Sequence, residues 1–485
     1  MPPTERQLSY IKFYKEGIIV NIQFLIVCLY IVFLFAISYY AQHLARGTVA
    51  NYVLAGRKLT TPLIMVTIVG LAVGGASTIG VAEQAYKVGL SAGWYTTAWG
   101  IGAIVMGILL AKRYRKIDIT TIPEMLNRHY NKAGMVAGIF CQILIQLVIM
   151  SLQYVAGGSI LCALMPDVFS LEGGMITSAI VFIGVTSIGG MWSSALANVL
   201  NVALQYIGVI IATVICVSIN GGLDNIVLRV PEGVPYFDFI DGVGLMTIIS
   251  WIVVLITVNL SLQSIVQISL GAKDAKTARN GFVYGGLMML PVGFICALLG
   301  IIAKINFPDV SPALALPMTI MQLDPILAGL TLAALWAADV STACNLLLSS
   351  ATLFSQDIYA RTINPHADQV KLVRITKILV VLLGLLTLGL AMTISGIIAT
   401  LMIGLSLLAP FSLIVLITMF APNLCRKSAA FNAIIAGIIT LVLWKFCPAT
   451  HILPQLIYQE WAVSIIVFFG TMLFDKRKID AIEKL

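Results

Sequence analysis

Long runs of hydrophobic residues dominate this chain, and polar residues are concentrated in the short segments between them. A helix needs about 20 apolar residues to cross a bilayer. Thirteen runs lie near this length, at approximately 18–40, 61–86, 93–112, 134–165, 174–190, 195–219, 242–266, 280–305, 326–356, 372–394, 395–421, 429–446 and 455–474. Only Ser395-Gly396 interrupts the stretch 372–421. The pattern predicts an all-α polytopic membrane protein with about 13 transmembrane helices.

The amino-acid composition also indicates a polytopic membrane protein. Hydrophobic residues make up 60% of the 485 residues and charged residues 10%, against roughly a quarter charged in soluble domains. A soluble fold of this length has too little interior to hide so much apolar surface. These values exclude a soluble enzyme, a nucleic-acid-binding protein and a disordered chain. We expect a lipid bilayer as the surroundings and no nucleic acid as a partner.

The distribution of basic residues predicts an orientation. Most of the 29 Lys and Arg residues fall in one alternating set of loops, which includes Arg57, Lys58, Lys273 and Arg279. Cytoplasmic loops carry an excess of Lys and Arg, so we expect the N-terminus outside and the C-terminus in the cytoplasm, in the plasma membrane. No basic residue lies at the middle of a predicted span. This disfavours a di- or trianionic substrate.

A cluster of small residues lies halfway along the second span, in the segment 69–78, Val-Gly-Leu-Ala-Val-Gly-Gly-Ala-Ser-Thr. Glycine destabilises a helix interior by about 1 kcal/mol relative to alanine. One interpretation is that the helix unwinds here and leaves carbonyl groups free to bind a cation or a solute. The other is that small residues let a neighbouring helix approach closely.

The ninth span contains Asp339, the only acid that the sequence places deep in a long apolar helix, followed by Ser341 and Thr342. A charge at the bilayer centre costs at least ~2.5–3.5 kcal/mol. Asp339 should therefore have a cation, a proton or a hydrogen-bond partner. A single hydroxyl in a helix usually bonds the carbonyl one turn earlier. Two hydroxyls beside a carboxyl group, opposite a glycine-rich helix, favour a site for a small cation.

Five motifs occur in order along the chain, and together they resemble the sodium/solute symporter family over nearly its whole length. They are Gly70–Gly80 with Ala85-Tyr86-Lys87-Val88-Gly89, Thr121-Ile122-Pro123-Glu124 with Arg128-His129-Tyr130, Ser187-Ile188-Gly189-Gly190-Met191, Ala272-Lys273-Asp274-Ala275-Lys276-Thr277-Ala278-Arg279, and Ser341-Thr342 with Gln356-Asp357-Ile358-Tyr359.

The resemblance implies the leucine-transporter fold, with two inverted five-helix repeats, one extra helix before them and two after. The corresponding segments are 1–60 for the N-terminal segment and extra helix, 61–219 and 242–421 for the repeats, and 422–485 for the two C-terminal helices and cytoplasmic tail. It also implies a sodium site between the first and eighth core helices. The implied ligands are the carbonyls of Gly70, Val73 and Ala338 and the hydroxyls of Ser341 and Thr342.

Two departures from the family pattern narrow the prediction. Members with a second sodium carry an aspartate after a threonine in the fifth core helix, where this chain has Ala197-Asn198, and the partner positions are Cys344 and Asn345. We therefore expect one sodium ion. The tyrosine that some sugar carriers use as an inner gate falls at Val258, and the family's Gln-Arg pair after that helix reads Gln267-Ile268. These two differences disfavour a sugar as the substrate.

One glycine and six polar residues on the core helices are candidates for the solute site. They are Gly74, Ser77, Gln153, Tyr154, Asn259, Gln263 and Asp339. Asp339 could pair with a substrate amine, tune the sodium site, or hydrogen-bond a neighbouring hydroxyl while protonated.

The sequence thus predicts a symporter and not an enzyme. Sodium is the coupling ion, with no organic cofactor. The substrate is a small organic solute, neutral, zwitterionic or cationic and amino-acid- or amine-like, imported by alternating access, and the protein is expected to work as a monomer. A proton-coupled transporter that uses Asp339, and a solute-sensing membrane protein of the same fold, remain as alternatives.

Overall fold

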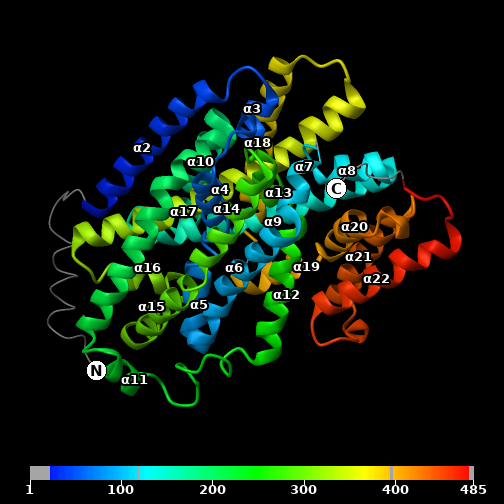
Figure 1. Cartoon of the computed structure of the whole chain (residues 1–485). Helices are drawn as coiled ribbons and strands as arrows, with labels where there is room; N and C mark the ends of the chain where they lie inside the picture. Colours follow the sequence, from blue (N-terminus) through cyan, green and yellow to red (C-terminus); the bar gives the residue numbers. More distant parts are fainter. Residues whose placement is uncertain (1–21, 118, 394–396, 480–485) are drawn as a thin grey trace.

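The computed structural model describes residues 22–117, 119–393 and 397–479, and every regular element within these residues is a helix (Figure 1). The predicted break at Ser395-Gly396 lies outside the described residues. The helices are α2 (Ile22–Leu44), α3 (Val49–Val53), α4 (Thr61–Ala72), α5 (Ile79–Val88), α6 (Trp94–Met106), α7 (Lys112–Lys116), α8 (Ile122–His129), α9 (Lys132–Leu164), α10 (Leu171–Ile219), α11 (Leu223–Arg229), α12 (Leu245–Ser261), α13 (Gln263–Gly271), α14 (Ala275–Met289), α15 (Val292–Asn306), α16 (Ala315–Ile320), α17 (Pro325–Thr352), α18 (Gln369–Ala391), α19 (Ile397–Ser406), α20 (Ala409–Phe420), α21 (Ala429–Phe446) and α22 (Leu456–Phe474). The π-helical segments η3 (Gly107–Ala111) and η5 (Leu353–Ile363) continue α6 and α17.

Several helices begin at a polar residue that caps the first turn. Asn131 Oδ1 accepts the Gly134 N–H at 2.7 Å before α9, and Asp274 Oδ1 accepts the Thr277 N–H at 2.7 Å before α14. Each cap supplies an acceptor for an amide that has no partner within the helix. The hydrogen bond from the Thr277 amide also holds the pKa of Asp274 below its usual range.

Ten helices of the described chain are long and apolar enough to cross a membrane, or eleven if the bent pair α12–α13 is one span. This count is lower than the thirteen spans expected because an interrupted span is not counted and two expected spans that join at a kink are counted as one. In the second expected span, α4 has only 12 residues before the helix is interrupted. α10 has 49 residues, which at 1.5 Å per residue amount to roughly 70 Å of helix, more than one bilayer thickness.

α10 consists of two helices joined at a kink. Gly190 has φ 56° and ψ −139°, values outside the helical region. The kink lies between the expected spans 174–190 and 195–219. A Cβ atom on Gly190 would lie 2.5 Å from the carbonyl oxygen of Tyr52, so both the backbone conformation and the close packing require glycine here.

Helices of the described chain are interrupted at two further places that matter for the site. Residues 73–78 separate α4 from α5, and Leu262 separates α12 from α13, with a bend of 51°. α17 packs against α10, α9 and α4, so it lies beside the first break. α2 lies on one side of the bundle and α21 and α22 lie on the other (Figure 1).

The outer surface of the bundle is apolar. Leu29 and Val32 of α2 are 61% and 66% exposed, and Leu385 and Leu386 of α18 are 55% and 61% exposed. Soluble monomers rarely expose apolar surface over such an extent. These side chains are the surface that a bilayer would cover.

We expect the substitution Gly190→Ala to destabilise the protein. A residue forced into this region of φ and ψ costs of order 1–3 kcal/mol, and the new methyl group would also meet the Tyr52 carbonyl. Thermal unfolding of the purified protein, followed by loss of the monodisperse gel-filtration peak, measures the effect. Gly389→Ala is the control, because nothing lies within 4 Å of an added Cβ there. Equal stability of the two variants would contradict this role of Gly190.

Candidate cation and solute site

The break between α4 and α5 leaves four backbone carbonyls, those of residues 70–73, that a continuous helix would pair. Val73 has φ −96° and ψ 54° and ends α4. Ser77 Oγ donates to the Ala72 carbonyl at 2.5 Å, and Gln205 Nε2 of α10 donates to the Val73 carbonyl at 2.9 Å. Two side-chain hydroxyls of α17 donate to the other two carbonyls, those of Gly70 and Leu71. The unwinding that the glycine cluster suggested is therefore present.

Ser341 and Thr342 are those hydroxyls. Ser341 Oγ lies 2.6 Å from the Gly70 carbonyl oxygen and 2.9 Å from that of Ala338. Thr342 Oγ1 lies 3.0 Å from the Gly70 carbonyl, 3.0 Å from the Leu71 carbonyl and 3.1 Å from the Ala338 carbonyl. Both side chains are 2% exposed. Four of the five oxygens expected to bind sodium thus converge between α4 and α17.

The fifth expected ligand, the Val73 carbonyl, lies at the same break but accepts the hydrogen bond from Gln205. The hydroxyls of Ser341 and Thr342 donate to carbonyls in this arrangement, and rotation about the C–O bond would turn their lone pairs toward a bound ion. Uncharged oxygens of this kind fit a hard monovalent cation. The residues present are therefore compatible with sodium.

A row of polar side chains on α10 contacts this region through Asn198 and Gln205, and the sequence analysis did not predict it. The row consists of Ser194, Asn198, Asn201 and Gln205, all buried. Asn198 lies against Gly70, where an added Cβ would be 2.8 Å from its amide nitrogen, and neither polar atom of its side chain has a hydrogen-bond partner. The spacing of four, three and four residues, which places the row on one helix face, was the available signal.

Asp339 and Gln153 meet on the other side of the break. Asp339 is fully buried, and neither carboxyl oxygen has a hydrogen-bond partner. Gln153 Oε1 accepts the Gly75 amide at 2.9 Å. A Cβ on Gly75 would lie 2.8 Å from Asp339 Oδ1, and one on Gly74 would lie 2.6 Å from Gln153 Oε1 and would also overlap Thr342 Oγ1. The two glycines thus allow the broken helix to contact α9 and α17 at once.

The remaining solute-site candidates have different surroundings. Ser77 lies in the break itself, and its carbonyl accepts the Thr96 hydroxyl at 3.0 Å. Tyr154 donates to the Gly384 carbonyl of α18 at 3.4 Å, on a different face of α9 from Gln153. Asn259 bonds the Leu255 carbonyl one turn earlier at 2.8 Å. Gln263 accepts the Ile122 amide at 2.9 Å, near α8. The structure therefore brings Gly74, Ser77, Gln153 and Asp339 together but not the other three.

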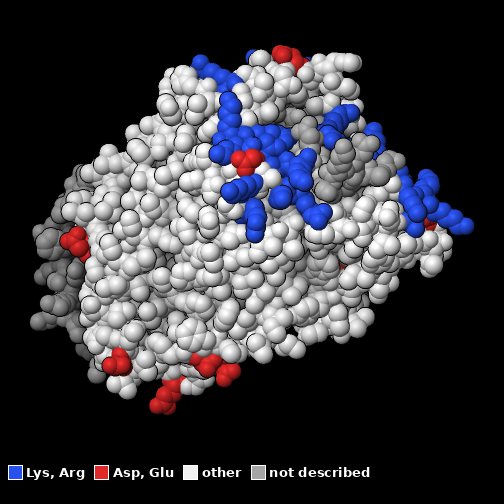
Figure 2. Space-filling view, viewed as in Figure 1, with Lys and Arg blue, Asp and Glu red and all other residues white. Residues whose placement is uncertain are grey.

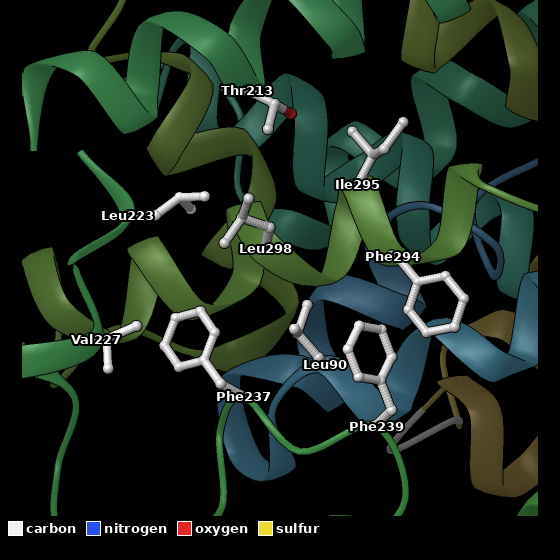
Figure 3. Close-up of a pocket in the computed structure, with 9 residues that line it drawn as sticks. All are labelled: Leu90, Thr213, Leu223, Val227, Phe237, Phe239, Phe294, Ile295 and Leu298. Carbon is white, nitrogen blue, oxygen red and sulfur yellow. The ribbon is translucent and has the colours of Figure 1, made fainter.

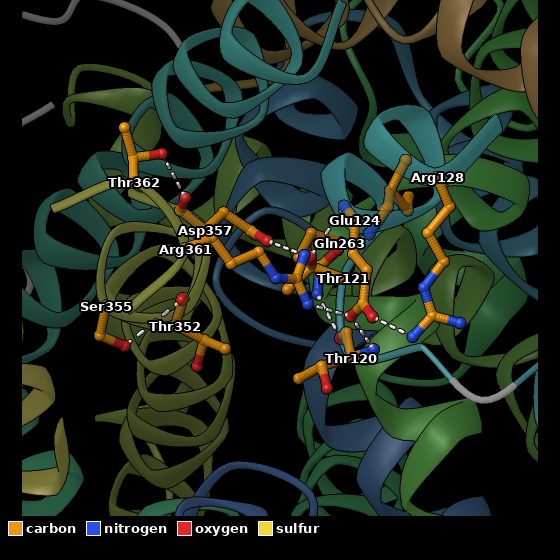
Figure 4. Close-up of polar contacts among 11 residues, drawn as sticks. Thr120, Thr121, Glu124, Arg128, Gln263, Thr352, Ser355, Asp357, Arg361 and Thr362 are labelled. Atoms are coloured by element: carbon orange, nitrogen blue, oxygen red, sulfur yellow. Dashed lines mark hydrogen bonds and ion pairs between the residues drawn. The ribbon is translucent and has the colours of Figure 1, made fainter. Parts of the chain in front are cut away.

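Two of the family-like motifs meet at one end of the molecule through charged side chains (Figure 4). Glu124, 8% exposed, forms ion pairs at 2.5 Å with Arg128 and at 2.5 Å with Arg361. Arg361 also contacts Asp357 Oδ1 at 2.6 Å. The Thr120 amide donates to Glu124 Oε2 at 2.7 Å. This cluster, called the charge network below, connects α8 to η5, the extension of α17.

A cavity of about 380 Å³ lies elsewhere, between α10, α15 and the segment around α11 (Figure 3). Its lining is apolar apart from the Thr213 hydroxyl and includes Leu298, Phe237 and Phe294. It shares no residue with the candidate site, so we do not assign it to the transported solute.

Apolar helices that are interrupted at mid-span, with carbonyls and hydroxyls meeting at the interruption, are characteristic of secondary transporters. The fold and the site thus define this class of membrane protein. The model of the sodium:solute symporter family matches residues 52–437, and the chain belongs to this family. Membership makes sodium-coupled transport of a small solute, and not catalysis, the class of activity.

Relatives within the family have different substrates in their names. The chain is 24% identical to a sodium/glucose cotransporter of Vibrio parahaemolyticus, covering 93% of this chain and 90% of that protein. It is 27% identical to the sodium/pantothenate symporter of Escherichia coli (74% and 77% covered) and 22% identical to a sodium/proline symporter of Staphylococcus aureus (94% and 93% covered).

The fold resembles that of a Na⁺-coupled sialic acid symporter in a substrate-bound outward-open state. The TM-score is 0.77 at 16% identity, with 95% of this chain and 99% of that chain covered. A nucleobase-cation-symport-1 family transporter in a closed conformation gives a TM-score of 0.61 at 14% identity, with 86% and 93% covered.

We expect the substitution Gly74→Ala to weaken sodium binding about tenfold or more, a change of ~1.4 kcal/mol. The added methyl group would displace Thr342 Oγ1 from the Gly70 carbonyl. The measurement is the rise in melting temperature with sodium concentration, compared with choline. Gly470→Ala, where nothing lies within 4 Å of the new Cβ, should respond like the wild type. A wild-type response from Gly74→Ala would rule out the assigned position of the ion.

Proposed function

We propose that the protein is a sodium-coupled symporter that imports a small organic solute by alternating access. The proposed solute is neutral, zwitterionic or cationic and resembles an amino acid or an amine. The observation that carries the proposal is the convergence of the Gly70 and Ala338 carbonyls with the Ser341 and Thr342 hydroxyls at a broken helix. One sodium ion would bind there, with the Val73 carbonyl completing the ligand set.

The proposed solute site lies directly beside the ion, at Gly74, Ser77, Gln153 and Asp339. Gly74 lies between Thr342 of the proposed ion site and Gln153 of the proposed solute site. A movement at one of these two sites would therefore be transmitted to the other. The buried Asp339 carboxyl has no protein hydrogen-bond partner. A primary or secondary ammonium group on the solute would supply both the charge and the donors that it lacks. This is our reason for preferring an amine-bearing solute.

We further propose the architecture of thirteen spans with inverted repeats at 61–219 and 242–421. The first helix of each segment is interrupted, at residues 73–78 and at Leu262, which supports a correspondence between the two. The Lys and Arg side chains gather at the end of the molecule that carries α7 and α8, whereas acidic side chains lie toward the end that carries α11 (Figure 2). The basic end, which carries α7 and α8, is the proposed cytoplasmic side, in the plasma membrane, and the proposed functional unit is the monomer.

In the proposed cycle, sodium holds the broken helix against α17 and so prepares the solute site. Movement of the helix bundle then closes one side and opens the other. The charge network lies on the proposed cytoplasmic side, where Glu124 and Arg361 connect α8 to η5. Inward opening would separate these two elements. The membrane potential drives the charged step with ~2.3 kcal/mol per charge per 100 mV.

One observation supports a second candidate function. The unpartnered Asp339 carboxyl would also suit a proton as the coupling ion, and the protein would then be a proton-coupled transporter. A solute sensor with the same fold is the remaining alternative, and no contact in the described residues favours it.

Replacing both Ser341 and Thr342 by alanine tests the sodium assignment. We expect the sodium affinity for uptake in proteoliposomes to fall by at least about 100-fold, roughly 2.7 kcal/mol, because two of the five ligands are removed. Thr352→Ala is a matched control on the same helix, since its hydroxyl bonds the Leu348 carbonyl at 2.7 Å within its own helix. If uptake keeps its sodium dependence in the double variant, the assigned site is wrong.

Asp339→Asn tests the solute class. A thermal-shift screen of small solutes in sodium and in choline first identifies a ligand. We expect an amine-bearing solute whose affinity falls about 100-fold, ~2.7 kcal/mol, in the variant, while the sodium response persists. Asp309→Asn, an exposed loop carboxylate, is the control. An unchanged solute affinity with a lost sodium response would instead assign Asp339 to the ion. Uptake that follows pH and ignores sodium would identify proton coupling.

A further inference from the structure

A second buried carboxyl group lies far along the chain from the candidate site, in the C-terminal helix pair. Glu460 of α22 is fully buried, and neither of its carboxyl oxygens has a hydrogen-bond partner. Ser464 lies one turn further on the same face of α22, is also fully buried, and its hydroxyl has no partner. Glu460 lies in the second turn of α22, and the sequence analysis did not single it out.

The carboxyl group of Glu460 is enclosed by α21 and the start of α20. A Cβ on Gly437 of α21 would lie 3.0 Å from Glu460 Oε2 and 3.0 Å from Pro410 Cγ, so the glycine provides the space that the carboxyl group occupies. Pro410 lies in the first turn of α20 and has no N–H, so its backbone offers no donor to the carboxyl group.

No basic side chain on the neighbouring elements compensates the charge of an ionised Glu460. α12, α19 and α20 contain no acidic or basic residue, and the only charged residue of α21 is the exposed Lys445, eight positions beyond Gly437. α9 places the thiol of Cys141 close enough to Glu460 to interact with it electrostatically. Tyr458 is the only other titratable residue of α22.

We propose that Glu460 is a proton-binding site, in which the carboxyl group stays protonated in the folded protein and bonds to Ser464. An unpaired carboxylate in apolar surroundings is strongly unfavourable, and the group neutralises instead. A metal ion is a poorer fit, because calcium and magnesium take six or more oxygens and this site offers three side-chain oxygens from one turn of one helix. This site is independent of the proposed transport site.

The position of Glu460 gives the proton a structural role. α22 packs on α20 and α21 at this place, so loss of the proton would put an uncompensated charge between the C-terminal helices and the rest of the bundle. Gln459, the preceding residue, donates to the Thr450 carbonyl at 3.0 Å and accepts the Ile452 amide at 3.2 Å. These bonds hold the loop before α22 against the first turn of that helix.

Infrared spectroscopy of the purified full-length protein at neutral pH tests the proposal. The wild-type-minus-Glu460→Gln difference spectrum should contain the C=O stretch of a protonated carboxylic acid, with equal intensity in sodium and in choline. Glu232→Gln, which replaces an exposed loop carboxylate, should give no such band. The amide resembles the neutral acid, so Glu460→Gln should change the melting temperature by less than about 2 °C.

Three results would overturn the assignment. Absence of the acid band would mean that Glu460 is ionised. A band that appears only in choline would make sodium the occupant. A large destabilisation of Glu460→Gln, comparable to that of Glu460→Ala, would mean that the negative charge is needed. Ser464→Ala keeps the carboxyl group and provides a test that does not depend on Glu460→Gln: the acid band should persist and move to higher frequency, because the acid loses its hydrogen-bond partner.

Discussion

A bilayer offers no water to a free backbone carbonyl, and the region around the α4–α5 break is arranged to meet this constraint. The four carbonyls of residues 70–73 are each satisfied by a hydroxyl or an amide side chain, from α17, from α10 or from the break itself. These contacts also tie three parts of the bundle together. A cation that binds to the same oxygens would replace hydrogen bonds that the fold already requires. The stability of the break and the affinity for the ion therefore depend on the same atoms.

Much of this arrangement could be predicted from the sequence because its signals are local. Glycines at mid-span indicated either an interruption of the second span or close packing with a neighbour, and the structure has the interruption. Two adjacent hydroxyls beside Asp339 indicated the partner helix. The count of spans was harder to predict, since the two halves of α10 join directly at the Gly190 kink with no loop between them. A helical pattern alone does not show whether a kink ends one span and begins another.

Side-chain direction accounts for most of what the sequence did not provide. Tyr154 is adjacent to Gln153 in the chain, yet the two side chains leave α9 about 100° apart, and only Gln153 faces the break. Gln263 follows the second break closely but reaches α8. The polar row on α10 and the buried Glu460 depend on which neighbouring helix covers each face, and a single sequence does not contain that information.

The ion pair between Glu124 and Arg361 matters for the carrier without cargo as well as for the loaded carrier. A symporter must return to the outward-facing form after releasing its cargo, and in the proposed cycle the contact between Glu124 and Arg361 re-forms during that step. In the proposed cycle this contact would therefore favour the form that is closed to the cytoplasm, whether the carrier is empty or loaded. It would also oppose inward opening when only sodium is bound, because a lone ion would bring fewer new contacts to offset its loss. Tight coupling, with little wasteful entry of sodium, would then depend on residues far from either ligand.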